Sequence, residues 1–264
     1  MLVDYHVHST CSGDGHVPME GMCVRAVELG ISEIAFTEHF DNNKLDMCRG
    51  MFHLDTYRSE IESARKAFGD KLRIYTGIEF GEPYMYPDVV EDVKTWGLDV
   101  VLGSMHWIGD TIIAVDHFAD SDIDELYRGY FAEALKMLEF GGFDVVAHFD
   151  LVKRFGVKYA GPFDFERYRD RIAAILEVMV RQGIALEVNT SGLRQPCKET
   201  FPGLETLRLY RDLGGEMVTI GSDSHRLEQL GFGLREGMDL IRQAGFQSIT
   251  VFEQRESRFV NIAV

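Results

Sequence analysis

The stretch Leu2-Val3-Asp4-Tyr5-His6-Val7-His8 has a pattern that returns along the whole chain. A short apolar run ends in two histidines spaced two residues apart, so both imidazoles point to the same side of a strand. Four more histidines lie at the downstream ends of apolar runs: His39, His106, His148 and His225. Chance would scatter such residues along the runs, whereas the active sites of parallel barrels collect at the carboxyl ends of the strands. This distribution predicts a metal site carried by a barrel.

Seven apolar runs alternate with amphipathic segments, which predicts an α/β fold with a parallel barrel. The runs are Leu2–His8, Glu33–His39, Leu72–Phe80, Asp99–Trp107, Val145–Asp150, Ala185–Ser191 and Met217–His225. The clearest helical period spans Asp164–Arg181, where one apolar face should cover the sheet. Phe40–Leu54 and Ile108–Ser121 are long connections that could wall the site, and Ile249–Val264 could form a closing strand or a hairpin.

Composition limits the class of protein. With 264 residues and 45% hydrophobic content, we expect one barrel domain over residues 1–264. No apolar stretch reaches the roughly 18 to 20 residues that span a bilayer, so we expect a cytoplasmic protein without a membrane partner. Its four cysteines form no CxxC pair and should be reduced. The sequence leaves the oligomeric state open.

The net charge limits the kinds of partner that the protein can bind. There are 43 acidic and 27 basic residues, for a formal charge of −16, which disfavours nucleic acid and anionic membranes. A small anionic substrate would need local positive charge, which divalent metals could supply at one spot.

Carboxylates accompany the histidines. Asp14 lies in the glycine-rich loop 11–15, Glu79 ends the third run, and Asp223 precedes His225 in the seventh. Mixed imidazole and carboxylate donors suit zinc, iron or manganese.

These motifs together resemble the polymerase and histidinol phosphatase (PHP) family over nearly the whole chain. The resemblance rests on His6-x-His8 with Asp14, Thr37-Glu38-His39, the separate Glu79, His106 and His148, and Gly221-Ser222-Asp223-Ser224-His225. It implies a distorted (β/α)7 barrel with three divalent metal ions at the carboxyl ends of the strands.

The resemblance also implies a ligand set with no position missing. The first metal would be bound by His6, His8, Glu79 and Asp223, the second by Glu79, His106 and His148, and the third by Asp14, His39 and His225.

Such a site favours hydrolysis of a small-molecule phosphate monoester, because a hydroxide shared between cations is a ready nucleophile. Glu79, Asp223 and His225 are the predicted catalytic residues. Arg194 is the preferred phosphate ligand because guanidinium matches phosphate oxygens, and Lys153 and Arg154 are further candidates. His16, His53, His117 and Asp150 remain open as the acid that protonates the leaving group.

Within the family, the chain looks like the branch that hydrolyses L-histidinol phosphate to L-histidinol and phosphate in histidine biosynthesis. Its acidic surplus is consistent with a cationic amine on the substrate, which carboxylates could meet: Glu38, Asp41, Glu82 or Asp116. The alternatives are a phosphoesterase acting on nucleotides, oligonucleotides or phosphotyrosine, and a metal-binding module without turnover.

Overall fold

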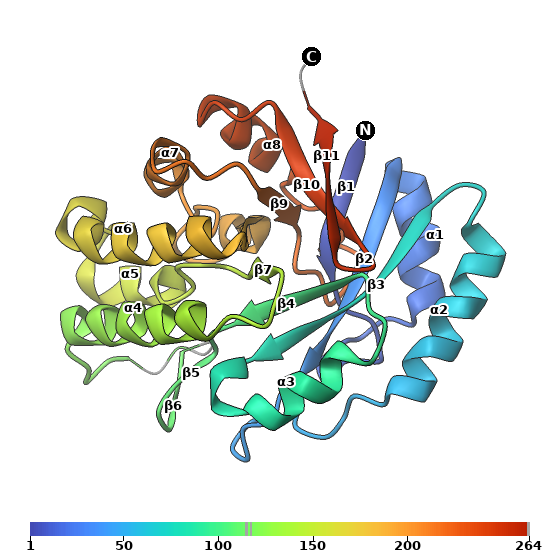
Figure 1. Cartoon of the computed structure of the whole chain (residues 1–264), viewed down its shortest axis with the longest axis horizontal. Coiled ribbons are helices and arrows are strands. Elements are labelled where there is room, and N and C mark those ends of the chain that lie inside the picture. The colour runs from blue at the N-terminus through green and yellow to red at the C-terminus, as the bar shows by residue number, and fades with distance from the viewer. Residues whose placement is uncertain (114–115, 117, 263–264) are drawn as a thin grey trace.

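The computed structural model describes residues 1–113, 116 and 118–262. Seven parallel strands form one sheet whose order, β1-β2-β3-β4-β7-β8-β9, follows the chain, and helices surround it (Figure 1). The strands are β1 (Leu2–Val7), β2 (Ile31–Phe40), β3 (Arg73–Gly81), β4 (Val100–Ser104), β7 (Val145–Val146), β8 (Ala185–Asn189) and β9 (Val218–Gly221). The predicted seven-stranded α/β barrel is confirmed.

The barrel closes where β1 meets β9. The Asp223 amide donates to the carbonyl of His6 at 2.8 Å, and the His8 amide donates to the carbonyl of Ser224 at 2.9 Å. Both bonds lie beyond the end of β9, among residues predicted to bind metal. Closure of the barrel therefore brings the first and seventh histidine motifs together.

Helices cover the outer side of the sheet because each carries one apolar face. They are α1 (Met19–Leu29), α2 (Leu54–Phe68), α3 (Pro87–Lys94), α4 (Ile123–Phe140), α5 (Lys153–Ala160), α6 (Phe165–Gln182), α7 (Leu204–Asp212) and α8 (Leu234–Gln243), with short 3₁₀ turns η1 (Pro83–Met85) and η2 (Thr190–Arg194). No helix in the described ranges is long and apolar enough to cross a membrane.

Helix α6 illustrates how the sequence sets these elements. Asp164 caps its first turn by accepting a hydrogen bond from the Arg167 amide, and Gly183 ends it in the left-handed conformation. The predicted apolar positions, including Tyr168, Ile172 and Met179, are buried. The prediction of 164–181 was correct to within one residue at each end.

Five of the seven predicted runs are longer than the strands they form, and two of them show the physical reason. The run from Val145 forms only the two residues of β7, because the chain turns out of the sheet at His148, whose φ is 28°. Trp107 lies outside β4, in a small antiparallel hairpin of β5 (Trp107–Ile108) and β6 (Thr111–Ile112). Glu82 accepts hydrogen bonds from the amides of His106 and Trp107, which holds the chain away from the sheet there.

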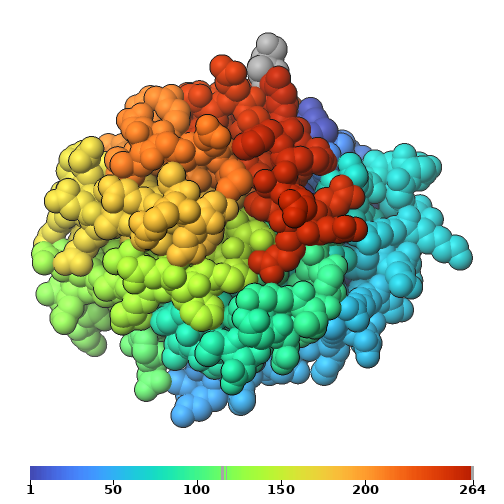
Figure 2. Space-filling view, in the orientation of Figure 1, coloured from blue at the N-terminus to red at the C-terminus, as the bar shows by residue number. Residues whose placement is uncertain are grey.

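The last described segment forms a hairpin, which is one of the two alternatives predicted for Ile249–Val264, and not a strand that closes the barrel. Strands β10 (Ser248–Glu253) and β11 (Glu256–Asn261) pair antiparallel and form a separate sheet. Arg258 reaches Glu33 at 2.5 Å, and Arg255 pairs with Asp144 at 2.9 Å. Figure 2 shows this segment, in red, covering the middle of one face of the molecule. The hairpin thus packs against residues at the upstream ends of the barrel strands, away from the histidines.

Candidate active site

Strand register brings the predicted ligands to one place. Parallel strands share a direction, so the downstream ends of all seven meet at one rim. In the pairing of β2 with β3, His39 lies directly opposite Glu79. The nine residues predicted to bind metal all lie in this cluster: His6, His8, Asp14, His39, Glu79, His106, His148, Asp223 and His225.

Glu79 lies at the centre and is 1% exposed. Its Oε1 lies 2.6 Å from Nε2 of His148 and 3.1 Å from Nε2 of His106. Its Oε2 lies 3.2 Å from Nε2 of His6 and 3.2 Å from Nδ1 of His39. One carboxylate therefore faces imidazoles from four other segments of the barrel, which is the geometry that a bridging ligand needs.

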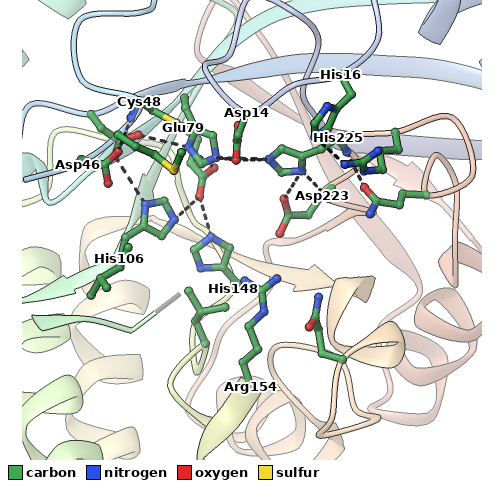
Figure 3. A pocket seen from close by; sticks show the side chains of 18 of the residues that line it. Asp14, His16, Asp46, Cys48, Glu79, His106, His148, Arg154, Asp223 and His225 are labelled. Carbon is green, nitrogen blue, oxygen red and sulfur yellow. Dashed lines mark hydrogen bonds and ion pairs between the residues drawn. The ribbon is translucent and has the colours of Figure 1, made fainter. Parts of the chain in front are cut away.

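A second part of the cluster lies around His225. Asp14 Oδ2 is 3.2 Å from Nε2 of His225 and 3.6 Å from Nε2 of His39. Asp223 Oδ1 is 3.7 Å from Nδ1 of His225 and 3.5 Å from Nε2 of His8. Figure 3 shows Asp14, Asp223 and His225 together on one side of the cavity, with His106 and His148 on the other.

The donor set fits divalent metal ions. Three groups offer ligand atoms within 4.8 Å of one another: His6, His8 and Glu79; His8, His39 and His225; and His39, Glu79 and His106. Imidazole nitrogen and carboxylate oxygen are the donors that zinc, iron and manganese take in proteins.

Electrostatics also favour cations at this site. Burial raises the pKa of the Glu79 carboxyl, but the imidazoles of His39 and His6 outweigh it and hold that pKa well below its ordinary value. Burial and the imidazoles of His225 and His39 lower the pKa of His8 to about 3. The carboxylate is thus ionised and the His8 imidazole neutral, which are the states that bind metal. Burial lowers the pKa values of His6, His106 and His225, but nearby carboxylates outweigh it and raise them, so these imidazoles would release protons when a metal binds.

A carboxylate that the sequence analysis did not identify orients two of the histidines. Glu187 of β8 is 1% exposed and lies 2.7 Å from Nδ1 of His6. Its second oxygen accepts hydrogen bonds from the His148 amide at 2.7 Å and from Asn189 Nδ2 at 3.1 Å. Carboxylates that hold the outer nitrogen of a metal-binding histidine fix its tautomer and ring orientation. The sequence did contain a sign of this support, since Glu187 and Asn189 are polar residues two positions apart in an otherwise apolar strand.

His8 has a similar support. Ser12 Oγ lies 3.0 Å from its Nδ1, and that hydroxyl donates to Glu38 at 2.7 Å. Ser12 Oγ also accepts a hydrogen bond from the His39 amide at 2.8 Å. Glu38, which lies within the family motif, therefore supports the site through the serine.

Two of the predicted ligands have a backbone in the left-handed region, which residues other than glycine rarely adopt. The φ angle is 28° at His148 and 52° at Asp223. Glu187 holds the first through its amide, and Arg194 holds the second by donating to the carbonyls of Ser222 at 2.7 Å and Asp223 at 2.5 Å. Such conformations persist where several contacts determine them, and they are concentrated at functional sites.

Seven of the nine clustered side chains line a cavity of about 360 Å³, whereas His6 and His8 are buried and do not line it. Both long connections contribute to its walls, as predicted: Asp46, Met47 and Cys48 come from the first, and Ile112 comes from the second. Arg154 and Arg194 also line it, together with Arg226, which the sequence analysis missed although it directly follows His225.

Lys153 does not reach this cavity, which corrects the prediction that it binds substrate. Its side chain is 1% exposed, and its amine pairs with Asp150 at 2.9 Å and with Glu199 at 3.3 Å. The amine also lies 5.6 Å from the ring centroid of Phe201. Lys153 therefore pairs with the buried carboxylate of Asp150. Because Asp150 does not line the cavity either, its position does not support a role as the leaving-group acid.

The remaining candidates for that acid are placed differently. His16 lines the cavity, where its Nε2 lies 2.9 Å from Arg226. His53 is exposed and precedes α2. His117 lies outside the described residues.

Comparison with known proteins agrees with the barrel and its motifs. Residues 4–191 match the model of the PHP domain, which is well over half of the chain. The protein belongs to the PHP family.

The relatives that this chain resembles are named for the same activity. A histidinol-phosphatase from Lactococcus lactis is 28% identical over 254 residues, covering 95% of this chain and 94% of that protein. A probable histidinol-phosphatase from Thermotoga maritima is 29% identical over 250 residues, covering 95% of each. The crystal structure of histidinol phosphate phosphatase from Lactococcus lactis, complexed with zinc, L-histidinol and phosphate, superposes with a TM-score of 0.87 at 26% identity, covering 97% of this chain and 98% of that one.

Proposed function

We propose that this protein is a metal-dependent phosphoric monoester hydrolase that converts L-histidinol phosphate to L-histidinol and phosphate. The observation that carries the proposal is the convergence of nine metal-competent side chains in one cluster, seven of which line a single cavity. The similarity to a Lactococcus enzyme bound to zinc, L-histidinol and phosphate supports the choice of substrate.

Three ions are proposed, each with its own ligands. His6, His8, Glu79 and Asp223 would hold the first; Glu79, His106 and His148 the second; and Asp14, His39 and His225 the third. Zinc, manganese and iron all suit these donors, and zinc is the metal of the Lactococcus structure. Bound divalent cations would acidify a water molecule and neutralise phosphoryl oxygens.

The protein's own groups would complete the reaction. Arg154 and Arg194 line the cavity beside the cluster and supply planar donors for phosphate oxygens. Arg194 also holds the backbone of Asp223, so it joins phosphate binding to the geometry of that carboxylate. Asp223 lines the same cavity, and its second carboxylate oxygen would hold the proton that the attacking water gives up, while His225 would keep its ion in place beside it.

The test is phosphate release from L-histidinol phosphate, compared with nucleoside monophosphates, phosphotyrosine and an aryl phosphate. We expect the metal-loaded protein to prefer L-histidinol phosphate and the chelated protein to be inactive. Preference for another ester would refute the substrate, and full activity after complete removal of metal would refute the mechanism.

A matched pair of arginine variants tests the phosphate ligands. Arg154→Ala should raise KM for the phosphate ester by about tenfold or more, since a charged hydrogen bond to substrate is lost. Arg167→Ala removes the same charge from an exposed position on α6 and should leave KM unchanged. Equal KM values in the two variants would exclude Arg154 from phosphate binding.

A further inference from the structure

Asp4 is a buried carboxylate that the proposed reaction does not use. It lies two residues before His6 on β1, so its side chain points to the same side of the strand, one step further from the rim. Asp4 is fully buried, and no lysine, arginine or histidine in the part of the chain that the structure describes forms an ion pair with it. A carboxylate that is buried without a cation is costly, and it depends on the groups that donate hydrogen bonds to it.

The donors to Asp4 come from both ends of one loop, residues 222–231, which we call the ligand loop. This loop follows β9 and precedes α8. Asp4 Oδ1 accepts a hydrogen bond from the Ser222 amide at 2.8 Å. Its Oδ2 accepts from the Ser222 hydroxyl at 2.6 Å and from the Gly231 amide at 3.1 Å. One carboxylate therefore closes the base of the ligand loop.

The ligand loop carries groups of the site between these two ends. Asp223 and His225, two of the predicted metal ligands, lie close to its first end, and Figure 3 shows both at the cavity. Gln229 lines the same cavity near the second end. Its Oε1 accepts a hydrogen bond from the His225 amide at 2.9 Å, which links the two halves of the loop. A shift of the second end would therefore reach His225.

The other contacts of this region hold carbonyl groups. Arg194 donates to the carbonyls of Ser222 and Asp223, and the Thr190 hydroxyl donates to the carbonyl of Phe232, just beyond the loop, at 2.6 Å. The amides of Ser222 and Gly231 donate to Asp4 instead. Because a backbone N–H that loses its acceptor inside a protein costs free energy, the position of both loop ends depends on this carboxylate.

We propose that Asp4 is a positioning residue that fixes Asp223 and His225 for metal binding by closing the base of the ligand loop. This inference rests on the proposed metal-dependent phosphatase function. It also distinguishes the three proposed ions. The first and the third each take a ligand from the loop, whereas the second takes none, so only two of the ions should depend on Asp4.

Asp4→Asn tests this role because asparagine has the same shape as aspartate. Each oxygen of Asp4 accepts from a backbone amide, so in either orientation the new NH2 group faces a backbone N–H and releases one end of the loop. The readout is the number of zinc ions retained per chain at a series of free zinc concentrations set by a chelator. We expect the affinity for two ions to fall about 10- to 100-fold, as for other groups that orient metal ligands, and the affinity for the remaining ion to stay at the wild-type value.

Asp99→Asn is the matched control. Asp99 is also buried, and its two oxygens accept hydrogen bonds from the amides of Gln254 at 3.0 Å and Thr76 at 2.8 Å, at the upstream end of the barrel. This substitution should lower the resistance to urea and leave the affinity for every zinc ion unchanged.

Ser222→Ala is a milder second variant, which serves if Asp4→Asn does not fold. It removes one of the three donors to Asp4 and keeps both backbone amides. It should weaken the same two ions by about threefold to tenfold, as for the loss of one hydrogen bond.

Two results would overturn the role of Asp4. One is wild-type affinity for all the zinc ions in Asp4→Asn, or in Ser222→Ala where that variant takes its place. The other is an equal loss of affinity for every ion, which a general loosening of the structure would produce. Failure of the proposed function looks different, since wild-type protein would then show no preference for L-histidinol phosphate, whatever the zinc affinities of the variants.

Discussion

Replacement of Glu187 by glutamine tests how the metal cluster is oriented. Glu187 touches no substrate-facing surface, yet its two oxygens accept hydrogen bonds from Nδ1 of His6 and from the amide of His148, both at 2.7 Å. Glutamine has the same shape but replaces one acceptor with a donor. If its amide faces His148, two donors oppose each other. If it faces His6, it favours the tautomer with a proton on Nε2, the atom directed at Glu79.

The expected magnitude follows from these contacts. One charge-assisted hydrogen bond is lost in either orientation, which costs about 1.5 to 3 kcal/mol. Because the strained geometry serves metal binding, the loss should fall mainly on metal affinity, as a decrease of about 10- to 100-fold. Activity at saturating metal should recover much of the wild-type value.

The assay is competition of Glu187→Gln with a chelator of known affinity, followed by kcat at saturating metal. Glu33→Gln is the matched control. It changes a buried carboxylate that accepts from Tyr75 at 2.8 Å at the opposite end of the barrel, so it should lower stability without changing metal affinity. The reasoning fails if Glu187→Gln binds metal within twofold of the wild type.

Two further substitutions test the buried charged groups Glu82 and Lys153. Burial raises the pKa of Glu82 to about 7 from an ordinary 4.5, so its contribution to stability is complete below pH 4.5 and is lost as the pH rises through 7. As the pH rises from 4.5 to 8, the free energy of unfolding of the metal-free protein should therefore fall by about 3 kcal/mol less in Glu82→Gln than in the wild type. The same pH dependence of unfolding in both proteins would contradict this. Lys153→Met should destabilise the protein by about 3 to 5 kcal/mol by leaving Asp150 charged and unpaired, with partial rescue by adding Asp150→Asn. Normal urea stability with a raised KM would instead return Lys153 to the phosphate site.

The barrel and the nine clustered side chains were predictable because both depend on local pattern. Alternation of apolar runs and amphipathic segments gives the strand order, and parallel strands must end at one rim. His39 and Glu79 could be expected near each other for this reason, before their register was known.

The supporting contacts were not predictable in the same way. Glu187 lies 181 residues from His6 along the chain, and a carboxylate inside an apolar strand gives no indication of its partner. Lys153 shows the opposite failure, because its position after His148 suggested a phosphate ligand at the mouth of the barrel, whereas its burial beside Asp150 became evident only from the packing. The outward turn at His148 likewise depends on a long-range hydrogen bond from its amide.

The hairpin of β10 and β11 has a consequence for the order of folding. Tyr5 donates to the carbonyl of Phe252 across 247 positions, and Arg258 reaches Glu33 across 225. Contacts so distant in sequence close very large loops and form slowly. During synthesis on the ribosome, β1 and β2 must wait for almost all the remaining strands before these partners emerge. Until then the upstream end of the barrel is uncovered, and the nascent chain depends on its first helices to protect the apolar strands.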